Sequence, residues 1–408
     1  GVIFVVVLLL SNYFYATFFY TNDPNLSIFQ LAFAEDSINK STSLSTIAIA
    51  VFCMASYENK KIALKKRITF NTLPELTITK KETVIVAALI MLYIFLGKGS
   101  LMSHKDDYSG QFEFGFRSYL KLAFVYLYYL IIKDVYNCRS ADSFKSFLRK
   151  SNPIILSLSL LTILFFLLTG GRVVPLRVIL LYLFCYTYFI KKISNVKIFI
   201  GAVSMAFILF LVGSLRNIWG DSEISQGTIA EVSDVKNVLY YFKDLVINSR
   251  SLYELVSYAD KTGYTFGISM LQDILAVGPG FQSFVINLGV SRESLNSAML
   301  VTSLYFHGDT YTIGLGTNIV GDVYVAFGLI GLIILFYFLG SFLKNLENKT
   351  YNGDFIACLL LVAFSMDVVF YTRNGYFAPL RNVVWIYIFY RIQFKQKFNK
   401  YIADNFNF

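Results

Sequence analysis

The sequence is poor in the residues on which soluble domains and metal sites depend. Only 15% of its 408 residues are charged, whereas an average soluble chain carries about 25%. Histidine occurs twice and cysteine four times, and no P-loop, dinucleotide-binding glycine pattern or paired Cys/His set is present. These shortages exclude a soluble protein, and they indicate neither a cofactor nor a metal.

Apolar residues are abundant instead, at 56% of the chain with a mean hydropathy of +0.58. A helix needs about 17 to 25 mostly apolar residues to cross a bilayer. Ten stretches approach this length, so we predict an all-α polytopic membrane protein that forms one transmembrane domain over residues 1–408. The predicted spans are 1–20, 42–57, 83–97, 116–135, 152–169, 174–190, 198–215, 318–343, 355–371 and 379–392.

The positions of the basic residues predict the orientation of these spans. Alternate loops hold 21 of the 36 lysines and arginines, and basic loops stay in the cytoplasm. Both termini are therefore predicted to be cytoplasmic, and the formal net charge of +10 reflects loop charge rather than a nucleic-acid partner. The long hydrophilic segment 216–317 then lies outside. Its helical periodicity and its glycines predict two to four short helices that cap the bundle.

Arginine and lysine are distributed differently across the predicted membrane. Seventeen lysines fall in the cytoplasmic loops and seven elsewhere, whereas four arginines are cytoplasmic and eight are outer. Charge that only sets topology should not distinguish the two residue types, but forked recognition of phosphate or carboxylate prefers arginine. The outer face is therefore predicted to bind an anion.

Two outer hairpins repeat one design. In each, a glycine-containing turn precedes a helix that starts near a proline, and one arginine lies in the turn while a second lies just inside the helix. The positive helix end and both guanidinium groups favour an anion at the membrane boundary. The predicted pyrophosphate-binding residues are Arg172 and Arg177 in the first hairpin, Arg373 and Arg381 in the second, and Arg216 at the outer end of the seventh span.

Further outer residues are candidates for binding sugar and for proton transfer. Trp219 suits stacking on a sugar ring, and with Glu223, Arg250 and Arg292 it forms the predicted substrate-binding set. General-base catalysis needs a group whose pKa is near the working pH, and histidine or a desolvated aspartate can supply it. The predicted catalytic residues are His307, with Asp309 to orient it, and Asp322, about one turn into the eighth span.

The run from Gly314 to Gly340, G-L-G-T-N-I-V-G-D-V-Y-V-A-F-G-L-I-G-L-I-I-L-F-Y-F-L-G, resembles the late helix of the bacterial O-antigen and capsule repeat-unit polymerases, the Wzy family. Gly263-Tyr-Thr-Phe-Gly267 with Gly278-Pro279, and Thr169-Gly-Gly-Arg172, are similar to further motifs of that family. Asp322 stands where the family pattern has glutamate.

The resemblance implies transfer of a growing glycan from undecaprenyl pyrophosphate to another lipid-linked repeat unit. It implies an inner-membrane glycosyltransferase of lipopolysaccharide or capsule biosynthesis, with an outer active site, no cofactor, and a Wzz-like chain-length regulator as a partner. Three rival functions stay open: an O-antigen ligase, a C-type polyprenyl-phosphate-sugar transferase that would use Glu35 and Asp36, and a lipid-linked oligosaccharide flippase.

Overall fold

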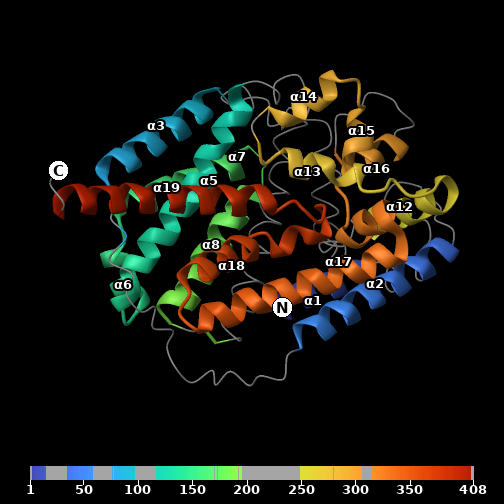
Figure 1. The fold of residues 1–408 in the computed structure, drawn as a ribbon, viewed down its shortest axis with the longest axis horizontal. Helices are drawn as coiled ribbons and strands as arrows, with labels where there is room; N and C mark the ends of the chain where they lie inside the picture. Colours follow the sequence, from blue (N-terminus) through green and yellow to red (C-terminus); the bar gives the residue numbers. More distant parts are fainter. Residues whose placement is uncertain are drawn as a thin grey trace, which may run out of the picture. The chain divides into compact units, whose positions relative to one another are not determined.

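The computed structural model describes the greater part of the chain, and its described secondary structure is helical without a strand (Figure 1). The described ranges are 2–14, 35–57, 76, 78–96, 116–169, 171, 173–191, 193–194, 249–278, 280–305 and 314–405. The predicted all-α class is confirmed for these residues.

Helices occupy nine of the ten predicted apolar stretches, and the remaining stretch, 198–215, lies outside the described residues. They are α1 (Val2–Phe14), α2 (Glu35–Ser56), α3 (Lys80–Leu96), α5 (Phe116–Asn137), α7 (Pro153–Leu168), α8 (Val173–Phe189), α17 (Ile319–Tyr351), α18 (Phe355–Ser365) and α19 (Leu380–Asn405). Among the described helices, α2 and α17 are long and apolar enough to cross a membrane. A third span results if α6 (Phe144–Lys150) and α7, bent by 105°, are counted together. The number of about ten spans stays a prediction.

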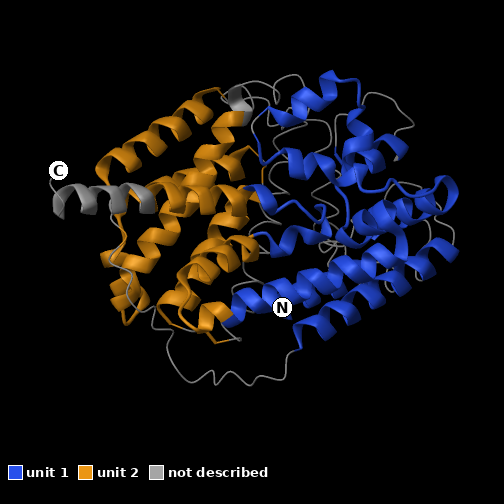
Figure 2. Ribbon diagram, viewed as in Figure 1, with its two compact units in different colours: residues 1–64, 234–348, 367–381 blue, residues 65–233, 349–366, 382–408 orange. Residues whose placement is uncertain are grey.

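The chain divides into two compact units (Figure 2). Unit 1 comprises residues 1–64, 234–348 and 367–381, and unit 2 comprises 65–233, 349–366 and 382–408. In unit 1 the described part of the long segment holds five α-helices, so the prediction of two to four was too low. They are α12 (Ser249–Thr262), α13 (Leu271–Leu275), α14 (Phe281–Asn287), α15 (Arg292–Leu295) and α16 (Ser297–Tyr305). The helices are short because Gly267, Gly280 and Gly289 adopt positive φ between them.

Aromatic rings of α1, α2 and η6 pack together in the core of unit 1. Phe4 of α1 packs against Phe52 of α2, with ring centroids 4.6 Å apart, and edge-on against Tyr371 at 5.4 Å. Tyr371 belongs to the short 3₁₀ helix η6 (Val368–Thr372). This packing fixes η6, and with it the turn that follows, against the buried faces of α1 and α2.

Helix α17 is longer than predicted and is broken at Gly328, where φ is 67° and ψ is −160°. A Cβ at this position would lie 2.7 Å from Cζ of Tyr264, so only glycine allows this approach. The break frees the carbonyl of Val325, which accepts a hydrogen bond of 2.9 Å from the backbone N–H of Thr265. The N-terminal piece of α17 is thereby tied to the segment before α13.

Unit 2 packs α3, α5, α7, α8 and α18 around a buried apolar core. Lys133 on α5 is fully buried and lies 3.1 Å from Glu82 on α3, which also accepts a hydrogen bond from Tyr126. A buried charge is tolerated when it is paired and hydrogen-bonded in this way. Lys133 is thus part of the packing between α3 and α5.

The predicted orientation can be tested with single cysteines on a background in which the native cysteines are replaced by serine. Ser291 and Lys145 are both exposed, and the basic-loop pattern places Ser291 outside and Lys145 inside. In spheroplasts, an impermeant maleimide should label Ser291→Cys and should label Lys145→Cys only after lysis. Labelling of Lys145→Cys in intact spheroplasts would reverse the topology.

Candidate functional site

Of the predicted site residues, Asp322, Arg373 and Arg381 lie in unit 1, at the start of α17, in the turn after η6 and at the start of α19. Arg250 is buried in α12 and Arg292 is partly buried at the start of α15. Arg177 is partly buried in α8 of unit 2. The remaining predicted residues lie outside the described part of the chain: Arg172, Arg216, Trp219, Glu223, His307 and Asp309.

Asp322 lies in the first turn of α17 and is only 1% exposed. The helix begins there because the side-chain oxygen of Asn318 accepts a hydrogen bond from the backbone N–H of Val320 at 3.0 Å. The amino end of a helix carries partial positive charge, which stabilises a carboxylate in this first turn. Asp322 Oδ2 also accepts a hydrogen bond of 2.8 Å from the backbone N–H of Tyr376, so its orientation is fixed.

The segment before α17 runs against Arg373. The backbone N–H of Thr317 donates a hydrogen bond of 2.9 Å to the carbonyl of Arg373. Gly316 has a φ of 77°, and a Cβ there would lie 2.7 Å from Cγ of Arg373. Glycine therefore lets the aliphatic stem of Arg373 lie against the backbone, while the residue as a whole remains exposed.

A second carboxylate, Asp273, faces the same point as Asp322. A Cβ added to Gly375 would lie 2.8 Å from Oδ2 of Asp273 and 2.9 Å from Oδ2 of Asp322. Because Gly375 has no side chain, both carboxylates can approach the same point beside its backbone. We call Asp273, Asp322, Arg373, Gly375 and Arg381 the acid–arginine site.

The environment of Asp273 favours its protonated form. Burial, followed by the negative charge of Asp322, raises the pKa of Asp273 to about 7, although the positive charge of Arg381 opposes this rise. Two like charges close together cannot both ionise easily. The pair therefore holds a proton that can be exchanged near neutral pH, and Arg381 is close enough to stabilise the pair when that proton leaves.

Buried polar side chains fix the backbone around this site. Ser297 of α16 donates to Thr317 at 2.9 Å. The amide of Asn318 donates to Asn12 of α1 at 2.8 Å, and Asn12 in turn donates to Ser45 of α2 at 3.0 Å. Buried polar groups that form hydrogen bonds with one another in this way favour a single packing arrangement of the helices that carry them. The site is consequently held by α1, α2, α16 and α17 together.

Sequence reasoning did not single out Asp273, although a signal was present. It is the one charged residue between Lys261 and Arg292. An acid that stands alone in an otherwise uncharged stretch is a candidate for a specific role, because aspartate is seldom buried without a partner. Its pairing with Asp322 depends on tertiary contacts, which the sequence does not display.

The acid–arginine site combines proton acceptors with fixed positive charge, which is suited to a reaction in which a hydroxyl loses a proton while an anion departs. Within the described residues, no group of three or more His, Cys, Asp and Glu side chains is placed to hold a metal ion. No family model, curated protein or solved structure matches the chain.

Proposed function

We propose that the protein is a membrane glycosyltransferase that polymerises lipid-linked oligosaccharide repeat units on the outer side of the bacterial cytoplasmic membrane. The donor is a glycan on undecaprenyl pyrophosphate, and the acceptor is the non-reducing-end sugar of a second lipid-linked unit. The single observation that supports this proposal best is the convergence of Asp273 and Asp322 on Gly375, beside Arg373 and Arg381.

The reaction requires both kinds of group in the acid–arginine site. The acceptor hydroxyl oxygen attacks the anomeric carbon of the donor sugar, and the bond from that carbon to the pyrophosphate oxygen breaks. The hydroxyl proton passes to the carboxylate pair, and the lipid pyrophosphate leaves with the electron pair of the broken bond. Arginines stabilise the departing charge, because a guanidinium fork matches phosphate oxygens.

The remaining predicted residues bind the substrates or transfer a proton in the same reaction. Arg172, Arg177 and Arg216 are further pyrophosphate ligands, and Arg250, Arg292, Trp219 and Glu223 bind sugar. His307, oriented by Asp309, is the second candidate for the general base, after the carboxylate pair. Attack by a hydroxyl on the face opposite to the pyrophosphate inverts the anomeric carbon.

The proposal is tested by reconstituting the purified full chain in liposomes with lipid-linked repeat units. Polymer should form in the presence of EDTA, because arginines neutralise the pyrophosphate that a divalent metal would otherwise hold. Loss of polymer in EDTA that magnesium or manganese restores would favour the C-type transferase with Glu35 and Asp36.

A deletion strain distinguishes a polymerase from a ligase and from a flippase. Single repeat units on the final glycolipid are expected for a polymerase. Intact polymer left unattached would instead identify a ligase. Repeat units retained on the cytoplasmic side would identify a flippase.

A further inference from the structure

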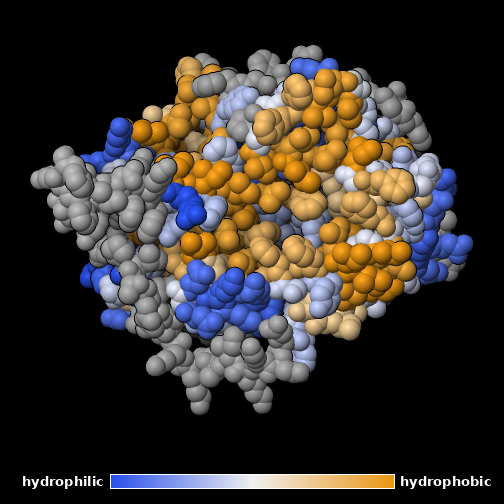
Figure 3. All heavy atoms as spheres, viewed as in Figure 1, coloured by the Kyte–Doolittle hydropathy of each residue, from blue (hydrophilic) through white to orange (hydrophobic). Residues whose placement is uncertain are grey.

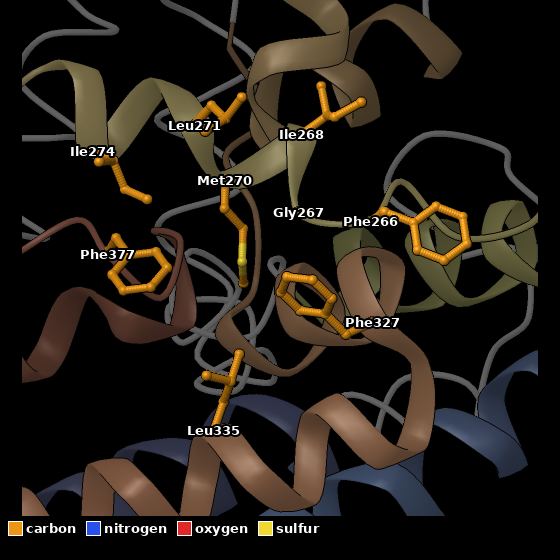
Figure 4. Close-up of a pocket in the computed structure, with 9 residues that line it drawn as sticks. All are labelled: Phe266, Gly267, Ile268, Met270, Leu271, Ile274, Phe327, Leu335 and Phe377. Atoms are coloured by element: carbon orange, nitrogen blue, oxygen red, sulfur yellow. The ribbon is translucent and has the colours of Figure 1, made fainter.

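An apolar cavity of about 400 Å³ lies in unit 1. Its lining carries no charged side chain and includes three phenylalanine rings. In Figure 4 the side chain of Met270 points into the space bounded by Phe327, Leu335 and Phe377. The lining residues are Phe266, Gly267, Ile268, Met270, Leu271, Ile274, Phe327, Leu335 and Phe377.

Two backbone segments contribute residues both to this cavity and to the acid–arginine site. Leu271 and Ile274 line the cavity from α13, and Asp273 lies between them in the sequence. Phe377 lines the cavity from another side and directly follows Tyr376, whose backbone N–H binds Asp322. The cavity and the acid–arginine site are therefore neighbours along the same two segments, α13 and the turn after η6.

The apolar surface continues beyond the cavity onto α14, which packs against α13. Phe281 and Phe284 of α14, and Leu288 directly after the helix, are 61%, 63% and 67% exposed. Figure 3 shows apolar side chains over α13 and α14 on the displayed face of unit 1. An exposed apolar surface of this kind marks a lipid or partner contact.

We infer that the cavity binds the isoprenoid units next to the pyrophosphate of the lipid-linked substrate. This inference rests on the proposed function, which supplies a polyprenyl pyrophosphate, and it adds the part of the protein that recognises the chain. The arginines beside the carboxylate pair complement the charge of the pyrophosphate head. The volume lies within the range of ligand pockets, roughly 300 to 1,000 Å³, so only the first units fit and the rest of the chain lies in lipid.

The cavity selects the chain by shape rather than by hydrophobicity. Lipid tails are as apolar as the cavity lining, so transfer of a chain from the bilayer gains little hydrophobic free energy. Close contact with methyl branches and planar double bonds is what the rings of Phe266, Phe327 and Phe377 can provide. Filling the cavity should consequently reduce affinity for the lipid without affecting affinity for its head group.

The experiment compares two Ile→Trp variants of nearly equal exposure. Ile274 lines the cavity and is 39% exposed, whereas Ile333 lies on α17 outside the lining and is 41% exposed. Binding of undecaprenyl pyrophosphate and of inorganic pyrophosphate is measured on the purified full chain in detergent. Ile274→Trp should weaken binding of undecaprenyl pyrophosphate about tenfold, or ~1.4 kcal/mol, and should leave pyrophosphate binding unchanged. Ile333→Trp should change neither.

Ile268→Trp, at a second lining residue that is 46% exposed, repeats the test if Ile274→Trp does not fold. Unchanged affinity for undecaprenyl pyrophosphate in a folded lining variant overturns the inference. Equal displacement of the polyprenyl lipid by dipalmitoyl phosphatidylglycerol also overturns it, because the cavity then binds membrane acyl chains. If the wild type binds the lipid through Ile274 but forms no polymer, the proposed function fails and the cavity assignment stands.

Discussion

Arg373→Lys should lower the rate of polymerisation by about a hundredfold or more, which is the typical cost of losing a charge-stabilising donor. Lysine keeps the positive charge, but its ammonium group is a point charge and cannot bind two phosphate oxygens as a guanidinium fork does. The stem of Arg373 packs against Gly316, and lysine retains that stem. The variant should therefore fold, and the loss should reflect chemistry. Rates are measured in liposomes with a fixed amount of inserted protein.

Arg149→Lys provides the matched control, because Arg149 is exposed on α6 in a loop predicted to be cytoplasmic. It should polymerise at the wild-type rate. Arg172→Lys makes the same test in the first hairpin, outside the described residues. Wild-type rates for both Arg373→Lys and Arg172→Lys would remove the anion-binding role from the two hairpins.

The positions of the helices could be predicted because long apolar runs in this sequence form helices. Runs at 83–97 and 116–135 coincide with α3 and α5 to within a few residues at both ends. The run at 42–57 ends with α2, but α2 already begins at Glu35. The break in α17 could not be predicted. Gly328 is one of several glycines in its run, and the close approach of Tyr264, which leaves no room for a side chain there, comes from a residue that is distant in the sequence.

The candidate site could be predicted only in part, because some of its residues are recognisable from the local sequence and others only from tertiary contacts. Asp322 was identifiable because an acid at the start of an apolar helix is costly, and Arg373 and Arg381 because of their hairpin. Asp273 was missed because its significance comes from the carboxylate that faces it across Gly375. Whether the hairpin of Arg177 and that of Arg373 act on one anion stays a prediction, since these residues belong to different units.

Asp322→Asn should lower the polymerisation rate by about a hundred- to ten-thousandfold, the usual contribution of a positioned base. The amide has the shape of the carboxylate and keeps an oxygen that can accept the hydrogen bond from Tyr376, so the turn after η6 is preserved. It cannot accept the proton of the acceptor hydroxyl. Asp142→Asn, at an exposed residue beside α6, is the matched control and should retain wild-type activity. Rates close to the wild type for Asp322→Asn would return the role of base to His307.

The pH dependence of these variants distinguishes a catalytic pair from a structural one. While Asp273 is protonated, the carboxylate pair carries that proton, and its loss at about pH 7 leaves both carboxylates able to act on the acceptor hydroxyl. Wild-type activity should therefore rise as pH increases through about 7. Asp322 raises the pKa of Asp273 by its negative charge, while Arg381 lowers it. Removing the charge at Asp322 therefore lowers the pKa of Asp273, and the residual activity of Asp322→Asn should rise at a lower pH than that of the wild type.

Asp273→Asn should lose the rise near pH 7 altogether. A purely structural pair would reduce the amount of folded protein and leave the midpoint of the profile where it was, and that result would contradict the proposed base.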